Sequence, residues 1–162
     1  MAIAPPAIPD AEELRLLLSQ LLGKPVTLKA PAGPPKPNPA PQFQALYCSD
    51  DGTPRAVASL DFLFAACLGA ALAMMPLAAA QDAAKTGKMS EMLLDCTKEV
   101  LNVSARLMNK PGGMRVVLKK VVSGTETLGP DIRAKMATAP LQREYDLEIG
   151  GYGRGRMVFR AA

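Results

Sequence analysis

Helical periodicity marks two long stretches of the chain. In the first, Asp10 is a suitable N-cap for a helix, and Gly23 is a suitable residue to end it. One apolar face lies between these two residues and consists of Leu14, Leu17, Leu18, Leu21 and Leu22. This spacing predicts an amphipathic helix over residues 12–22.

The second helical stretch runs from Lys88 to Asn109 and carries two neighbouring rows. The apolar row is Met89, Leu93, Cys96, Val100, Val103 and Leu107. Residues three and four apart form a polar row beside it: Lys88, Glu91, Asp95, Glu99, Asn102, Arg106 and Asn109. A solvated helix face is the ordinary interpretation of such a row. However, Asn102 is a weak helix former in mid-helix, and it gains little on a face that is merely solvated.

Shorter segments alternate with the period of a β-strand, and turn residues separate them. The predicted strands cover residues 26–29, 42–48, 55–60, 114–122, 143–149 and 156–160. Asp51-Gly52 predicts a hairpin turn, and residues 30–41, rich in Pro and Ala, predict an extended loop. Residues 125–140 are ambiguous, with a short helix expected after Pro130. The order predicts an α+β domain with two long helices on one face of a mostly antiparallel sheet. These are a helix that begins at Asp61 and the helix over residues 88–109.

Residues 62–80 contain no charged side chain and approach the length of a membrane-spanning helix. Ala makes up nearly half of this segment, which also contains Gly69 and Pro76, and Asp61 and Gln81 flank it closely. Ala contributes little to membrane insertion, and no aromatic belt is present. The segment is therefore interpreted as a buried helix kinked at Pro76, without membrane association.

Composition narrows the chemistry. The 162 residues are 49% hydrophobic and only 4% aromatic, which suits one domain over residues 1–162 with a core of small aliphatic side chains. The chain has no histidine, which excludes Ser-His-Asp and Cys-His catalysis within it and most zinc sites, so no metal site is expected.

The net charge of +4 mildly favours an acidic partner. Cys48, Cys67 and Cys96 are expected to be reduced, and residues 1–9 do not look like a signal peptide, so a cytoplasmic location is expected.

Asp95, Glu99 and Asn102 have the spacing Asp-x3-Glu-x2-Asn. Together with the order of elements, this pattern resembles the CheC/CheX/FliY family of chemotaxis phosphatases. The resemblance covers most of the chain, including the helix over 12–22 and the closing segment 148–153. It implies a CheX-like two-layer domain over residues 1–162, with the Pro/Ala-rich loop at 30–41.

Members of that family consist of two related halves. In the first half, Asp61 is placed at the position of Asp95, whereas Ala65 and Leu68 stand where the Glu and Asn would be. Only the second half is therefore expected to be active, as in CheX-like members. The family also has a proline downstream of the Asn; here Thr125 lies near that point, and the next proline is Pro130.

The resemblance implies a phosphatase that acts on the phosphoaspartate of a CheY-like response-regulator receiver domain. Asn102 would hold a water in line with the phosphorus, because an amide can both accept and donate and carries no charge. Glu99 would engage a lysine of the receiver site. Asp95, Lys98 and Arg106 are predicted to assist docking, although Lys98 and Arg106 also suit simple solubility. The chain would need no cofactor of its own, since the Mg²⁺ belongs to the partner, and a homodimer is compatible with the CheX-like pattern.

Two alternatives remain open. The same fold could serve as a catalytically inactive receiver- or partner-binding module of two-component signalling or of a flagellar-switch complex, which the departures from the family pattern favour. Nucleic-acid binding finds support in the glycine- and arginine-containing segment 152–156 and in Lys119-Lys120. Aromatic residues are scarce and the basic residues form no long run, so no nucleic-acid partner is expected.

Overall fold

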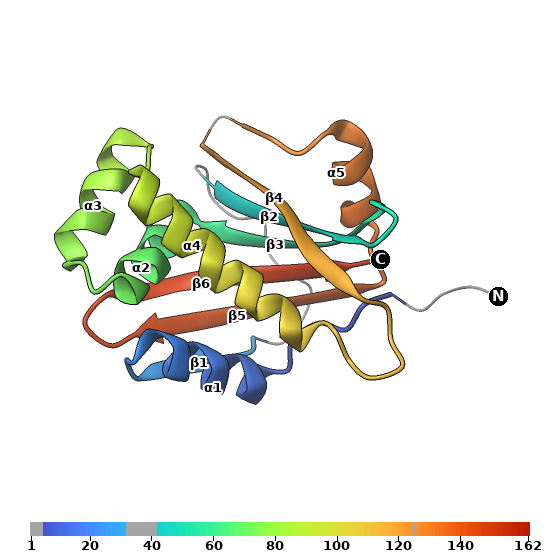
Figure 1. The fold of residues 1–162 in the computed structure, drawn as a ribbon, viewed down its shortest axis with the longest axis horizontal. Helices are drawn as coiled ribbons and strands as arrows, with labels where there is room; N and C mark the ends of the chain where they lie inside the picture. Colours follow the sequence, from blue (N-terminus) through green and yellow to red (C-terminus); the bar gives the residue numbers. More distant parts are fainter. Residues whose placement is uncertain (1–4, 32–41, 125) are drawn as a thin grey trace.

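The protein is described by a computed structural model that covers residues 5–31, 42–124 and 126–162. The strands are β1 (Val26–Lys29), β2 (Gln42–Ser49), β3 (Pro54–Asp61), β4 (Val116–Gly124), β5 (Leu141–Ile149) and β6 (Gly153–Ala161). The helices are α1 (Ala11–Leu22), α2 (Phe62–Leu72), α3 (Leu77–Thr86), α4 (Glu91–Ser104) and α5 (Pro130–Ala137), with a 3₁₀ turn, η1 (Ala105–Leu107), after α4 (Figure 1). Thr125 and most of the predicted loop at 30–41 lie outside the described residues.

All six strands form one antiparallel sheet in the order β1-β5-β6-β3-β2-β4. Along β2 the side chains alternate between two cores. Phe43 and Tyr47 point toward the main core, which also contains the buried residues of α1, α2 and α4. Leu46 and Cys48 point to the other face, where they meet Met136 of α5 in a smaller core. The predicted α+β class is confirmed. The sequence did not predict that α5 would pack against the second face of the sheet.

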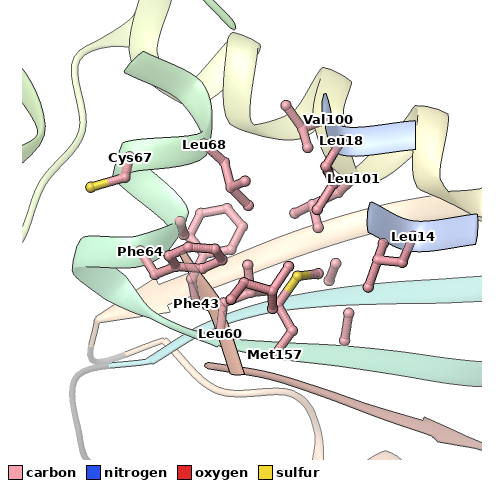
Figure 2. Close-up of a cluster of buried hydrophobic side chains, with 14 of the residues drawn as sticks. Leu14, Leu18, Phe43, Leu60, Phe64, Cys67, Leu68, Val100, Leu101 and Met157 are labelled. Atoms are coloured by element: carbon pink, nitrogen blue, oxygen red, sulfur yellow. The ribbon is translucent and has the colours of Figure 1, made fainter. Parts of the chain in front are cut away.

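The main core lies where three helices meet the sheet, and Figure 2 shows its centre. Leu14 and Leu18 of α1, Leu68 of α2 and Leu101 of α4 are fully buried. They pack over side chains from β2, β3 and β6, which are Phe43, Leu60 and Met157. Each fully buried side chain of this size contributes roughly 1.5–3 kcal/mol relative to exposure, so the helix layer is firmly attached to the sheet.

A single helix kinked at Pro76 was predicted over residues 62–80. This prediction is wrong, because α2 and α3 are two separate helices. Met74 adopts a left-handed conformation, with φ of 58°, immediately after α2. The Met75 N–H donates to the Ala70 carbonyl and the Met74 N–H to the Ala71 carbonyl, a pair of bonds that closes a helix C-terminus. Pro76 then occupies the N-cap of α3, where its missing N–H costs nothing. No helix in the described ranges is long and apolar enough to cross a membrane.

The second predicted helix is shorter than residues 88–109. The Ser90 hydroxyl oxygen accepts a hydrogen bond from the Leu93 N–H at 3.2 Å and caps α4, so Lys88 lies before the helix. Asn109 lies beyond η1, where its side-chain amide bonds both the N–H and the carbonyl of Val116. Asn109 therefore holds the start of β4 and does not extend the polar row. The short helix expected after Pro130 is confirmed as α5.

Candidate functional site

The candidate site is the outer face of α4, and its position depends on how the inner face is packed. The buried residues of α4 are Leu93, Thr97, Val100, Leu101 and Ser104. Only Leu93 and Val100 belong to the predicted apolar row, whereas Cys96, Val103 and Leu107 are half-buried. The buried stripe is thus rotated toward Thr97 and Leu101.

Thr97 and Ser104 were missed as core residues because their side chains are polar. Both are fully buried and satisfy their hydroxyls with carbonyl oxygens. The Thr97 hydroxyl lies 3.0 Å from the Leu93 carbonyl of its own helix and 3.0 Å from the Ala65 carbonyl of α2. The Ser104 hydroxyl donates to the Val100 carbonyl at 2.8 Å. The small hydroxyl residue Thr97 in mid-helix, together with the Ala- and Gly-rich sequence of α2, is the signal that could have identified this close packing.

The contact between α2 and α4 is tight at Gly69. A Cβ atom placed there would lie 2.3 Å from the Thr97 Oγ1 atom and 2.7 Å from the Leu93 carbonyl oxygen. Real Cβ atoms do not approach other atoms so closely, so glycine is required at this helix crossing. The contact fixes the position of α4 relative to α2.

A hydrogen bond from the sheet holds the middle of α4. The Tyr47 hydroxyl on β2 donates to the Leu101 carbonyl at 2.7 Å, and Tyr47 is fully buried. Burial raises the pKa of Tyr47, so its hydroxyl stays protonated as a donor. Leu101 immediately precedes Asn102, and the backbone that carries the candidate amide is therefore anchored to the sheet.

The outward face of α4 brings the predicted site residues together. Asp95, Glu99 and Asn102 are all exposed, as are Lys98 and Arg106. Glu99 and Asn102 are separated by three positions on a regular helix, a spacing that places Cβ atoms roughly 5–6 Å apart. Within the described part of the chain, no hydrogen bond or ion pair engages the five side chains. A carboxylate and an amide are therefore presented side by side on a rigid support, free to bind another molecule.

The structure also relates the two halves of the chain. The strand order is symmetric about the β3–β6 pair, so that β1, β2 and β3 correspond to β4, β5 and β6. The helix before β1 is α1 and the helix before β4 is α4. The sequence-based placement of Asp61 opposite Asp95 is therefore wrong, because α1, and not α2, is the counterpart of α4.

Asp61 has a different place in the fold. It ends β3, and its carboxylate accepts a hydrogen bond from the Arg156 N–H at 3.1 Å. On α1, the exposed residues include Glu12, Glu13, Leu16 and Gln20, and no Glu-x2-Asn pattern occurs. The expectation that only the second half carries the motif therefore stays a prediction. Its reason is that α1, the counterpart of α4, lacks the Glu-x2-Asn pattern.

The acidic and thiol side chains show no arrangement for metal binding or nucleophilic catalysis in the described part of the chain. No group of three or more Asp, Glu, Cys or His side chains able to hold a metal ion occurs in residues 5–31, 42–124 and 126–162. All three cysteines are free thiols. Burial raises the pKa of the Cys67 thiol to about 11 and also raises that of Cys48, so neither is an activated nucleophile.

Searches by sequence gave no match to a protein-family model or to a curated protein. Comparison of folds did give matches. The FliM middle domain from H. pylori has a TM-score of 0.66 at 13% identity, and the match covers 93% of this chain and 84% of that domain. Thermotoga maritima FliY has a TM-score of 0.57 at 16% identity, covering 92% of this chain and 82% of FliY.

A CheC-like chemotaxis protein from Shewanella oneidensis has a TM-score of 0.51 at 16% identity, and 92% of each chain is covered. At such low identity these matches concern the fold alone. The chain thus shares its fold with the FliM middle domain, FliY and this CheC-like protein.

Proposed function

We propose that this protein is a phosphatase that hydrolyses the phosphoaspartate of a CheY-like response-regulator receiver domain. The observation that carries the proposal is the exposed, unpartnered Glu99–Asn102 pair on the anchored helix α4. Hydrolysis of an acyl phosphate needs a water in line with the phosphorus, and the chemistry is mainly positioning. The Asn102 amide oxygen can accept from that water, and its NH₂ group can donate to a phosphoryl oxygen.

Exposure of the pair suits a substrate that is itself a protein. A phosphoaspartate lies in a shallow site on a folded domain, and a convex helix face can be placed over it. Glu99 would bind a lysine ammonium of the receiver, and this ion pair would hold Asn102 over the phosphorus. Asp95, Lys98 and Arg106 border the pair and would bind the rim of the receiver. The Mg²⁺ would be supplied by the receiver domain, and no cofactor of the chain itself is involved.

The test measures the lifetime of phosphoaspartate on purified CheY-like receiver domains, with and without this protein. The wild-type protein is expected to accelerate decay, and Asn102→Ala to slow the accelerated rate about 100-fold, because a mispositioned water costs that much. Gln20→Ala is the matched control, since it removes an exposed amide from α1, the counterpart of α4, and it should leave the rate unchanged.

The outcomes are distinguishable. Acceleration that disappears in Asn102→Ala but persists in Gln20→Ala supports the phosphatase. If a folded wild-type protein leaves the decay rate of every receiver unchanged, the phosphatase proposal is abandoned.

A second candidate is a binding module without catalysis. The higher TM-score to the FliM middle domain than to the CheC-like protein favours it, because one H. pylori FliM structure is a complex with FliG and another is a complex with SpeE. The module would dock a receiver domain or a flagellar-switch partner through α4. Binding of the receiver without any change in phosphoaspartate lifetime would select this candidate.

Both candidates place the protein in the cytoplasm, where receiver domains are found, and both are compatible with a homodimer. Light scattering after size-exclusion chromatography measures the assembly state, and this state can be compared with and without the phosphorylated receiver.

A further inference from the structure

A cavity of about 370 Å³ lies between α5 and the sheet face that the other helices leave uncovered. It forms because α5 has only eight residues and its apolar side covers one end of that face. Ile132 and Met136 pack there with Leu46 and Val57. Beyond Val57, the same face of the sheet carries polar side chains, so the cavity has an apolar wall and a polar floor.

The strand register places the polar side chains of the cavity floor next to one another. Arg160 on β6 lies opposite Gln142 on β5 and, on its other side, opposite Val57 on β3. In the neighbouring row, Ser59 on β3 lies opposite Gln44 on β2. Helix α5 adds the exposed Arg133 at the mouth.

The charge in this cavity is uncompensated. Two guanidinium groups, those of Arg133 and Arg160, line it, and no acidic side chain does so among the described residues. The nearby carboxylate of Glu144 is already paired with Arg156 at 3.0 Å. Burial, and secondarily the charge of Arg156, lowers the pKa of Arg160, so its positive charge is held at a cost in free energy. An anion bound beside it would offset that cost.

A buried hydroxyl provides a further donor. Ser59 is 2% exposed, and its oxygen accepts a hydrogen bond from the Gln44 side-chain amide at 3.1 Å. The hydroxyl proton itself has no acceptor within the described ranges. It can therefore donate to a ligand in the cavity. The Gln142 amide is held by the Ala139 carbonyl at 3.1 Å, which fixes this side of the floor.

We propose that the cavity between α5 and the sheet binds a small organic anion. Its carboxylate or phosphate lies between Arg133 and Arg160, and its apolar part lies against Val57, Ile132 and Met136. Arginine forms paired hydrogen bonds with both kinds of anionic group. The volume is within the range of small-molecule sites, and convergent polar groups beside an apolar wall suit a ligand with one anionic and one apolar end.

Isothermal titration calorimetry of the full chain tests the proposal with three probes that share one tail: octanoate, octyl phosphate and 1-octanol. At least one of the two anions is expected to bind, and octanol is expected to bind at least tenfold more weakly. Arg160→Gln and Arg133→Gln should each weaken the anion at least tenfold, since a hydrogen bond to a charged group contributes that much.

Arg154→Gln is the matched control, because it removes the same charge from the same strand at a side chain that is 84% exposed and does not line the cavity. It should change the affinity less than twofold. Binding that is equal for octanol, or weakened equally by Arg154→Gln, would overturn the proposal, as would no binding of either anion at millimolar concentration. If Arg160→Gln fails to fold, Arg133→Gln on the exposed side of α5 decides the matter.

Discussion

Tyr47 and Asn102 have different roles on α4: the first anchors the helix, and the second is a candidate site residue. The hydroxyl of Tyr47 reaches the helix backbone from the sheet, whereas the side chain of Asn102 faces solvent on the opposite side. An exposed side chain without a partner contributes little to stability, within about 0.5 kcal/mol. Asn102→Ala should therefore test function without disturbing the fold. A substitution of Tyr47 should instead lower the stability of the fold.

Tyr47→Phe is expected to lower the free energy of unfolding by about 1–2 kcal/mol, because it removes a buried hydrogen bond to the Leu101 carbonyl. Urea denaturation followed by circular dichroism measures this. Tyr152→Phe is the control: its hydroxyl donates to the Met75 carbonyl, but Tyr152 is only half-buried, so water can replace the bond and the cost should be smaller. An equal loss for both variants would contradict the assigned role of Tyr47.

Asp51, in the turn between β2 and β3, has a pKa lowered to about 2 by hydrogen bonds from the Ser49 hydroxyl and the Thr53 N–H. Because the folded-state pKa lies below the ordinary value of about 4, its stabilising effect is complete above pH 4 and is lost as the pH falls toward 2. Carbon-13 NMR titration should give a midpoint near 2 for the Asp51 carboxyl group. Ser49→Ala should raise that midpoint, and an unchanged value would rule out the hydroxyl as the main cause.

At the scale of elements, the crossing of α2 and α4 is the critical contact. Gly69→Ala is expected to destabilise the protein by about 1–3 kcal/mol, because the new methyl group would overlap Thr97 and the Leu93 carbonyl. Thermal denaturation measures the loss. Gly129→Ala is the control, since no atom lies within 4 Å of the position that a Cβ would take there. Gly129 is the N-cap of α5, so this variant should show only the smaller cost, below about 1 kcal/mol, of the poorer N-cap residue Ala. Similar stability for both variants would show that α4 can shift to accommodate the methyl group.

Helix ends that are set by residues nearby in the sequence were predicted well. Asp10 caps α1 with bonds from the Glu12 and Glu13 N–H groups, and Gly23 ends it in a left-handed conformation, as the sequence indicated. The helix break before Pro76 was not predicted, because Met74 adopts the left-handed conformation normally taken by glycine. No local pattern indicates that choice.

The site was predicted only in part, for a similar reason. Helical periodicity alone placed Glu99 and Asn102 on one face, and the structure shows that face exposed. The burial of the Thr97 hydroxyl depends on the approach of α2, which a sequence does not display. The correspondence of α1 with α4 depends on the strand order, which the sequence also does not display. Asp61 was for this reason wrongly matched with Asp95.

On the scale of the whole molecule, two units of one helix and three strands meet along β3 and β6. These central strands are paired on both sides, whereas β1 and β4 each have one neighbour among the described strands. The arrangement places the shortest strand, β1, at one edge and the lysine-bearing β4 at the other, which suits exposed sheet edges.

Native-state hydrogen exchange should follow this arrangement. Amide protons of β3 and β6 are expected to exchange slowest, through global unfolding, and those of β1 and α5 faster, through local opening. Mass spectrometry of exchanged peptides measures the order. Faster exchange in β6 than in β1 would contradict the central role of the β3–β6 pair.

The central position of β6 has a consequence for synthesis of the protein. The ribosome releases the chain from its N-terminus, so β3 and β5 emerge before the strand that joins them. Until residues 153–161 have emerged, each of these two strands exposes an unpaired edge. Such edges favour aggregation, and a nascent chain that stalls before β6 would therefore be a substrate for chaperones or proteases.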